Sequence, residues 1–425
     1  MPTSTGNNPL DIALTGQLLL ARPLHESRHG PFLELVELIR NADVAVAGFE
    51  GVMAGEGWPS PKATLHVAPE SVAETLSWMG FRLVALAGNH AFDLGPKGIV
   101  HTIQVLSDHG LVTSGTGKDP EASRRAAFFH TTAGSSIALL SRQLGPSAPT
   151  EQAVAAIALD NLPDRLTSRP GVAHIGVERT VSARPEIFAA LAGLLDESGH
   201  FRRRNERIAM GAESVTPNIL DAWGTPVVAG TSNRELWHVD PTGLDDLLSR
   251  VSNANEEGGS AIVHFHNHFW ASDPSVVPSW FTEMATAVAT AGAPIVMGHG
   301  YPGLQALELK QGHLVAHGLG SLAFHTRRPK NYNHLRYWES VVVLARLSSE
   351  RRCEKVELVP IVHGHHPCRT RRETDLGEPE LADFEVGRAI LERLGVRCGP
   401  FDSRIVVRRT RDRAVGELIE DASER

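Results

Sequence analysis

The 425-residue sequence predicts an α/β protein, and three observations support that prediction. Short apolar runs of four to nine residues recur along the chain and are typical of buried strands. Most of these runs are followed at once by Gly, Asn, His or Glu, as happens where parallel strands deliver polar residues into a cleft. Segments of helical period separate the runs, and strands that alternate with helices indicate a layered α/β architecture.

The predicted elements follow the chain in order. The first five strands are expected at Ile12 to Leu20, Val44 to Phe49, Arg82 to Ala87, Ala261 to Phe265 and Pro294 to Met297. Helices are expected at Phe32 to Arg40, Ser71 to Met79, Lys97 to His109, Pro185 to Glu197 and Trp280 to Ala291. Two further strands, Ser340 to Leu347 and Lys355 to Val362, precede a helix at about 380 to 395.

Composition excludes several classes of protein. A hydrophobic content of 42% and a charged content of 21% are those of a globular chain rather than a disordered one. The net charge of −8 leaves no excess of Lys and Arg to neutralise phosphates, so we expect no nucleic-acid partner. The sequence contains neither a signal peptide nor a membrane span, and its three cysteines form no CxxC pair, which predicts a cytoplasmic protein.

Two polar segments are predicted as loops. Residues of about 200–231 break the pattern with an Arg-rich loop and are interpreted as an insertion near the site. There Arg202, Arg203 and Arg204 either clamp a substrate carboxylate or phosphate or form a solvated charged turn. The second segment is the cluster of His363, His365, His366 and Cys368, which is interpreted as an exposed loop rather than a metal site.

Candidate metal ligands stand at the ends of four predicted strands. Asn89 and His90 follow one strand, Glu50 follows another, and His299 follows a third. The fourth strand carries three alternate histidines, His264, His266 and His268. Nitrogen and carboxylate ligands in this mixture suit Mn, Fe or Zn better than Mg or Ca, so the sequence predicts a divalent transition metal.

The order and spacing of these motifs resemble those of the CapA family, proteins of poly-γ-glutamate capsule biosynthesis within the calcineurin-like metallophosphoesterases. The most specific block is Asn89-His90-Ala91-Phe92-Asp93-Leu94-Gly95. Other matching stretches are Thr15-Gly16-Gln17, Ala42-Asp43 through Glu50-Gly51, Val263 to His268, Gly298-His299 through Glu308, Gly318 to Ser321, Glu339 to Val341, Glu357 to Pro360 and Gly399 to Phe401.

The resemblance implies a fold and a set of roles. The implied fold is a four-layer sandwich, in which helices flank two β-sheets, spanning residues 8–365, with residues 366–425 as a C-terminal extension that packs on it. By position, Glu50, Asn89, His266 and His299 resemble the ligands of one of the family's two metals. His90 would donate to the substrate oxyanion or leaving group, and Asp93 would orient it.

The other half of the family's two-metal site is missing from this sequence. Gly16 is followed by the neutral Gln17 where the family has Asp. The family's Gly-His-His-Pro-His run has become Gly298-His299-Gly300-Tyr301-Pro302, and Gly48 replaces an Asn. The implied site holds one metal, or a second metal only weakly through groups such as Gln17, His264 and His268.

A single metal weakens the case for ordinary phosphoester hydrolysis, because two metals normally stabilise the attacking and leaving oxygens. The expected function is hydrolysis, transfer or cyclisation of a γ-glutamyl or other peptide-like amide. A two-metal phosphoesterase and a non-catalytic scaffold in polymer or specialised biosynthesis stay as alternatives. The expected partner is a small-molecule or peptide-like substrate.

Overall fold

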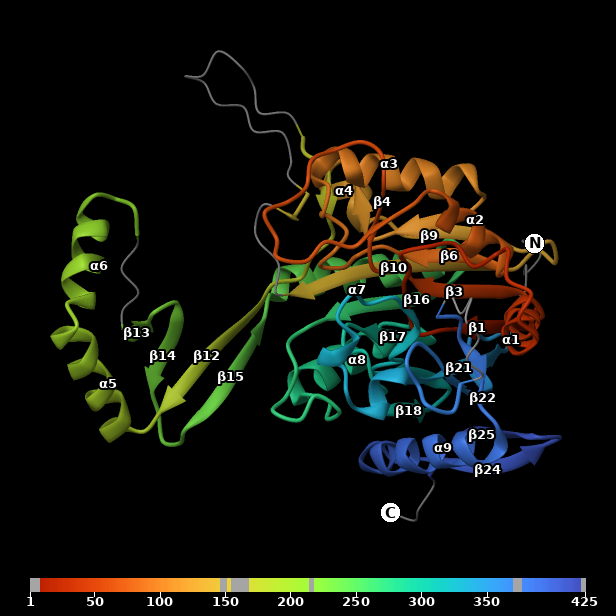
Figure 1. Cartoon of the computed structure of the whole chain (residues 1–425). Coiled ribbons are helices and arrows are strands. Elements are labelled where there is room, and N and C mark those ends of the chain that lie inside the picture. Colours follow the sequence, from red (N-terminus) through yellow and green to blue (C-terminus); the bar gives the residue numbers. More distant parts are fainter. Residues whose placement is uncertain (1–7, 146–150, 154–167, 214–217, 370–376, 422–425) are drawn as a thin grey trace, which may run out of the picture. The chain divides into compact units, whose positions relative to one another are not determined.

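The computed structural model describes residues 8–145, 151–153, 168–213, 218–369 and 377–421. The chain divides into two compact units, residues 1–175 with 243–425 and residues 176–242. Helices and strands mix throughout both (Figure 1), which confirms the predicted α/β class. Among the described residues, no helix is both long enough and apolar enough to cross a bilayer.

The larger sheet of the first unit contains the N-terminal strands. Its strand order is β24-β25-β22-β21-β1-β3-β6-β7, and β23 pairs with β22. The strands β1, β3, β6 and β7 run parallel, and β21 lies antiparallel on β1. The bounds are β1 Leu10–Leu14, β3 Val44–Gly48, β6 Phe81–Ala85, β7 Val112–Ser114, β21 Glu339–Leu347, β22 Cys353–Val362, β23 Glu380–Leu381, β24 Ser403–Thr410 and β25 Arg413–Glu420.

The smaller sheet of the first unit contains the histidine strands, in the order β18-β19-β17-β16-β10-β9. The four inner strands are parallel. Their bounds are β9 Ala127–His130, β10 Ser136–Gly145, β16 Gly259–Asn267, β17 Ile295–His299, β18 Leu307–Lys310 and β19 His313–Ala316. Short strand pairs complete the unit: β2 Gln17–Leu19 with β20 Ser321–Phe324, β4 Val52–Met53 with β5 Val67–Ala68, and β8 Thr116–Gly117 with β11 Gly171–Val172.

The hydrophobic core lies between the two sheets. Alternation along a strand sends Ile12 and Leu14 of β1 into a cluster with Leu139, Ile262 and Ile295 of the smaller sheet. The intervening residues of β1 and β3 face the opposite way. They pack against helices α1 (Gly30–Arg40) and α2 (Ser71–Trp78) in a second cluster. Strands β1, β3 and β6 are thus buried on both faces. Because they are parallel, their carboxyl ends lie at one edge of the sheet.

The remaining helices of the first unit are α3 Gly95–Asp108, α4 Pro120–Arg124, α7 Pro241–Glu256, α8 Ser279–Thr290 and α9 Phe384–Cys398. Helix α8 packs on β16, where the Phe281 and Phe265 ring centroids lie 5.8 Å apart. Helix α9 begins at an Asp383 cap, whose side chain accepts a 2.9 Å hydrogen bond from the Val386 amide.

The second unit is a four-stranded sheet with a helical hairpin. The strand order is β13-β14-β12-β15. The bounds are β12 Val177–Ala183, α5 Pro185–Glu197, α6 His200–Ala209, β13 Ile219–Ala222, β14 Thr225–Ala229 and β15 Arg234–Val239. The two ends of the unit meet, since the Asp240 amide donates a 2.8 Å hydrogen bond to the Gly176 carbonyl.

Two sequence-based interpretations of local structure are wrong. The Arg-rich segment predicted as a loop is the helix α6, and ion pairs from Arg204 and Arg207 to Glu213 extend past its end. In the segment predicted as an exposed loop, His363 and His366 are buried, whereas His365 and Cys368 are exposed. The His363 ring packs against Trp338, with ring centroids 5.8 Å apart, and His366 Nε2 lies 3.6 Å from Glu339.

Candidate metal centre

The predicted metal ligands gather at the carboxyl edge of the two sheets. Strand β3 ends two residues before Glu50, and β6 ends four residues before Asn89. In the other sheet, β16 contains His266 and β17 ends at His299, and these two residues pair in the strand register. Within each sheet the strands are parallel, so their carboxyl ends lie at one edge, and the 2.8 Å contact between Asn89 and His266 joins the two edges.

Glu50, His266 and His268 form a group that could hold a metal ion. One ligand atom from each lies within 4.8 Å of the others. The Nε2 atoms of His266 and His268 are 3.0 Å apart, and Glu50 Oε1 lies 3.9 Å from His266 Nε2. The amide oxygen of Asn89 lies 2.8 Å from the same His266 nitrogen. These four side chains offer the mixed nitrogen and oxygen donors that Zn, Mn or Fe bind.

The protonation of these groups fits a cation. Burial lowers the pKa of His266 well below its ordinary value and that of His268 to about 4, so both imidazoles are neutral near pH 7. Burial raises the pKa of Glu50 to about 7, against the opposing effect of His90. The Glu50 Oε2 atom is buried without a hydrogen-bond partner in the described part of the chain. A buried carboxylate and neutral imidazoles together are the donor set that a cation stabilises.

His90 lies beside the ligand group and contacts Asp93. Its Nδ1 atom is 2.7 Å from Asp93 Oδ2, and its Nε2 atom is 4.0 Å from Glu50 Oε1. Asp93 is fully buried, and burial alone would raise its pKa. The hydrogen bond from His90 and other neighbouring donors outweigh burial and hold the pKa of Asp93 below its ordinary value. An ionised Asp93 fixes the Nδ1–H tautomer of His90 and leaves Nε2 facing the ligand group.

Two residues that the sequence analysis missed hold this turn in place. Lys62 Nζ lies 3.2 Å from Asp93 Oδ1 and 2.7 Å from Glu151 Oε1, and it also donates to the Asn89 carbonyl. The His66 amide donates a 2.7 Å hydrogen bond to Asp93, and the His66 ring meets the His90 ring edge-on at 4.0 Å. Both lie between β4 and α2, where no periodic pattern marks a residue as important.

His299 lies outside the three-residue group and pairs with His264 instead. His299 Nε2 lies 3.0 Å from the Thr15 carbonyl oxygen, which can only accept, so this nitrogen donates. Its Nδ1 atom then accepts from His264 Nε2 at 2.9 Å, and His264 Nδ1 accepts from the Ser141 hydroxyl at 2.8 Å. The hydrogen-bond chain engages both nitrogens of each ring, so ligation by His299 or His264 stays a prediction.

Gly48 and Gln17 explain how this pair is accommodated. A β-carbon at position 48 would lie 2.3 Å from His299 Nδ1 and 3.0 Å from His264 Nε2. Only glycine leaves room for the hydrogen bond between the rings. The Gln17 side-chain oxygen accepts a 3.1 Å hydrogen bond from the Gly300 amide, which gives this predicted additional ligand a local structural partner.

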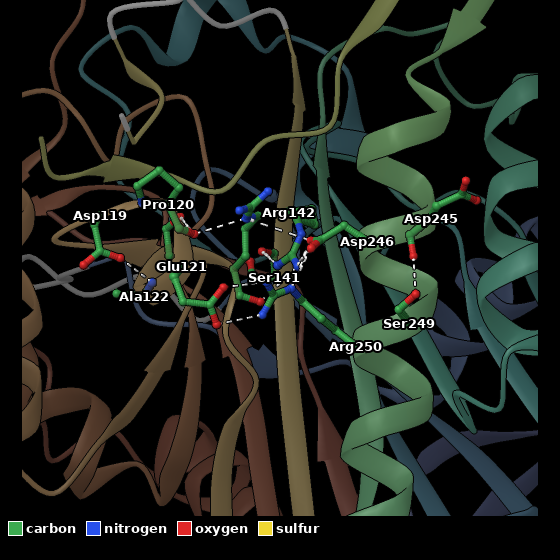
Figure 2. Close-up of polar contacts among 12 residues, drawn as sticks. Asp119, Pro120, Glu121, Ala122, Ser141, Arg142, Asp245, Asp246, Ser249 and Arg250 are labelled. Atoms are coloured by element: carbon green, nitrogen blue, oxygen red, sulfur yellow. Dashed lines mark hydrogen bonds and ion pairs between the residues drawn. The ribbon is translucent and has the colours of Figure 1, made fainter. Parts of the chain in front are cut away.

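A buried cation, Arg142, lies on β10 next to Ser141 (Figure 2). Arg142 is fully buried, and its guanidinium donates to the carbonyls of Ser141 and Arg124, both at 3.0 Å. Asp246 of α7 lies 3.7 Å away and is itself held by Arg250, which also binds Glu121. Burial lowers the pKa of Arg142 to about 9, so the group remains charged at neutral pH. The network ties α4 and α7 to the strand that carries Ser141.

The three predicted substrate-binding arginines lie in the second unit. Arg202, Arg203 and Arg204 are consecutive residues of α6. Arg203 donates to the Ser198 carbonyl at 3.2 Å, and Arg204 lies 3.5 Å from Glu213. Their role toward a substrate stays a prediction.

A cavity of about 310 Å³ opens onto the ligand group. Its polar lining includes Glu50, Asn89, His90 and His268. Five aromatic side chains also line it: Trp270, Tyr301, Phe324, Tyr332 and Tyr337. Such a space accepts a flat organic group beside the metal ligands.

Comparison with known proteins gives a consistent result. A family model described as "Bacterial capsule synthesis protein PGA_cap" matches residues 11–326. Two proteins of Sinorhizobium fredii (strain NBRC 101917 / NGR234), the uncharacterized proteins y4sH and y4uA, are each 24% identical to this chain. Each alignment extends over 454 residues and covers 95% of this chain and 93% of the relative.

Proposed function

This chain belongs to the PGA_cap (CapA) family of bacterial capsule synthesis proteins, within the metallophosphoesterase-like superfamily. We propose that it is a single-metal enzyme. Its reaction is hydrolysis or transfer of a γ-glutamyl or similar peptide-like amide. The proposal includes a four-layer sandwich as the fold. The core between the two sheets and the helices packed on their outer faces support it. Cytoplasmic residence also belongs to it, with three free cysteines in support.

The observation that carries the proposal is the Glu50–His266–His268 group with Asn89 beside it. A divalent cation held there supplies Lewis-acid activation of a carbonyl group and of water. The aromatic side chains that line the cavity orient a planar amide beside these donors. His90 moves the proton at its Nε2 atom, since its Nδ1 atom is held by Asp93.

The preference for one metal rests on the His264–His299 pair. The imidazole nitrogens of this pair bind each other, Ser141 and the Thr15 carbonyl. A second cation would have to break this buried hydrogen-bond chain and leave its members unsatisfied, which costs about 1–3 kcal/mol for each group. One cation activates a carbonyl, whereas phosphoryl transfer gains most from two.

Metal analysis and activity measurements test the proposal together. We expect one equivalent of Mn, Fe or Zn per chain, and loss of that metal in His266→Ala. His130→Ala, which removes an exposed imidazole elsewhere, serves as the control and keeps the metal. Activity is measured on γ-glutamyl-p-nitroanilide and on p-nitrophenyl phosphate with added Mn²⁺. Two metals per chain with phosphatase activity would replace the proposal with the phosphoesterase alternative, and no metal at all would support the scaffold.

A further inference from the structure

A second cavity adjoins the cavity of the metal centre. It measures about 250 Å³, and the two share six lining residues: Leu19, Thr64, His66, Phe324, Asn331 and Tyr332. Because so much of the wall is common, a ligand bound at the metal centre can extend into the second space. All of these residues belong to the first unit.

The second cavity is lined by positive charge. Arg327 and Arg328 line it, and none of its lining residues is Asp or Glu. Both arginines are exposed, and within the described residues no ion pair joins either of them to a carboxylate. Other arginines of the chain are neutralised, as Arg393 is by Glu339 at 2.7 Å. In a chain of net charge −8, an uncompensated pair of guanidinium groups at a cavity is a local exception.

Tyr332 and His66 lie at the junction of the two cavities. The Tyr332 ring is held edge-on by Phe324 at 4.8 Å and by Tyr337 at 5.6 Å. Burial and the Glu50 charge raise the Tyr332 pKa, so its hydroxyl stays protonated and can donate. The His66 ring meets the His90 ring at 4.0 Å, and His66 lines both cavities, the second of them together with Arg327.

We propose that Arg327 and Arg328 form an anion subsite that binds a carboxylate or phosphate group on the far end of the same substrate. Guanidinium groups bind either oxyanion through paired, charge-assisted hydrogen bonds. The subsite selects an elongated substrate whose reacting amide lies at Glu50, His266 and His268 while its anionic end passes Tyr332. This inference rests on the proposed function for the position of the reacting group, although the anion site itself has its own readout.

Binding measurements with a charge-matched control test the subsite. The test variant is Arg327→Gln/Arg328→Gln, and the control is Arg404→Gln/Arg411→Gln, which removes two exposed cations from the β24–β25 hairpin. The probes are a γ-linked glutamate trimer for the carboxylate source and inorganic pyrophosphate for the phosphate source. Calorimetry is done with and without Mn²⁺, at low and high salt.

We expect the test variant to bind at least one probe about tenfold more weakly, with an unchanged Mn²⁺ content and a reduced salt dependence. The control should bind like the wild type. Equal affinity in the wild type and the test variant, an equal loss in the control, or no binding of either probe by the wild type at millimolar concentration would overturn the subsite. If the wild type binds no metal but still shows arginine-dependent binding of a probe, the proposed function fails while the subsite stands.

Discussion

His264 Nε2 lies 2.9 Å from His299 Nδ1, with the two buried rings inclined at 68°. The pair joins neighbouring strands of the smaller sheet, and it lies against Gly48 of the larger one. This hydrogen bond therefore engages both His299, a predicted ligand, and His264, a predicted additional ligand. Its integrity depends on a residue that has no side chain.

Gly48→Ala should destabilise the protein by about 1–3 kcal/mol, the usual cost of overpacking a core. The added methyl group would meet His299 Nδ1 at 2.3 Å, so one of the rings must move and the hydrogen bond is lost. Urea denaturation measures the free energy of unfolding. Gly399→Ala is the matched control, since a β-carbon there meets no atom within 4 Å. Equal stability of the two variants would contradict the described packing around Gly48.

His268→Ala should weaken Mn²⁺ binding more than His299→Ala. His268 belongs to the ligand group, whereas the His299 nitrogens bind His264 and Thr15. Loss of even an outer-shell partner costs about 10–100-fold in metal affinity, and loss of a direct ligand costs more. Isothermal titration gives the affinities, and circular dichroism checks that both variants fold. The reverse order would make His299 a ligand, as the sequence resemblance implies.

Asp93→Asn should lower kcat by about 10²–10⁴-fold while the bound metal is retained, the range seen when a general acid–base loses its support. A neutral amide in place of the Asp93 carboxylate no longer fixes the Nδ1–H tautomer of His90, which it contacts at 2.7 Å. Asp412→Asn, at a side chain that is 97% exposed, controls for the loss of one negative charge. Retained activity in Asp93→Asn would remove His90 from the proposed role.

The stability of the protein should fall as the pH decreases from about 6.5 toward 3, partly through His363. Burial, helped by Arg369 and other positive neighbours, lowers the pKa of His363 to about 3. In this window the unfolded chain takes up a proton that the folded chain cannot, at about 1.4 kcal/mol per pH unit for one group. Above pH 6.5 both states are neutral, and the effect vanishes.

His363→Phe isolates this contribution. The aromatic ring keeps the edge-on contact with Trp338 at 5.8 Å but cannot titrate. Urea denaturation from pH 4.5 to 7.5 gives the free energy of unfolding at each pH. Its dependence on pH should be shallower in the variant, by a slope that corresponds to at most one proton. Parallel slopes for the two proteins would show that His363 is protonated in the folded state.

The sequence was sufficient for the elements whose apolar pattern is strong. Strand β3 and helix α5 were expected at Val44 to Phe49 and Pro185 to Glu197, and they lie at Val44–Gly48 and Pro185–Glu197. Helix α6 was missed because its charged stretch has no apolar period. Arginine and glutamate are nevertheless good helix formers, and α6 follows α5 after a single turn.

Only those residues of the candidate site that stand at or just after the ends of predicted strands could be found from the sequence. Alternation places His264, His266 and His268 on one face of β16 and its extension, but it cannot divide their roles. That division depends on depth: His264 is buried and contacts the His299 side chain, whereas His268 is half-buried near Glu50. Lys62 could not be found at all, because its importance arises from contacts with Asp93 and Glu151, 31 and 89 positions away.

The hydrogen bond between the Asp240 amide and the Gly176 carbonyl holds the two ends of the second unit together, so this unit can be removed or replaced as one piece. Its first and last strands, β12 and β15, run antiparallel with Val177 opposite Val239, so the chain leaves and returns at one point. A short glycine-containing turn could replace residues 177–239 without rerouting the flanking backbone. The same geometry allows the module to be exchanged or lengthened during evolution while the first unit keeps its connectivity.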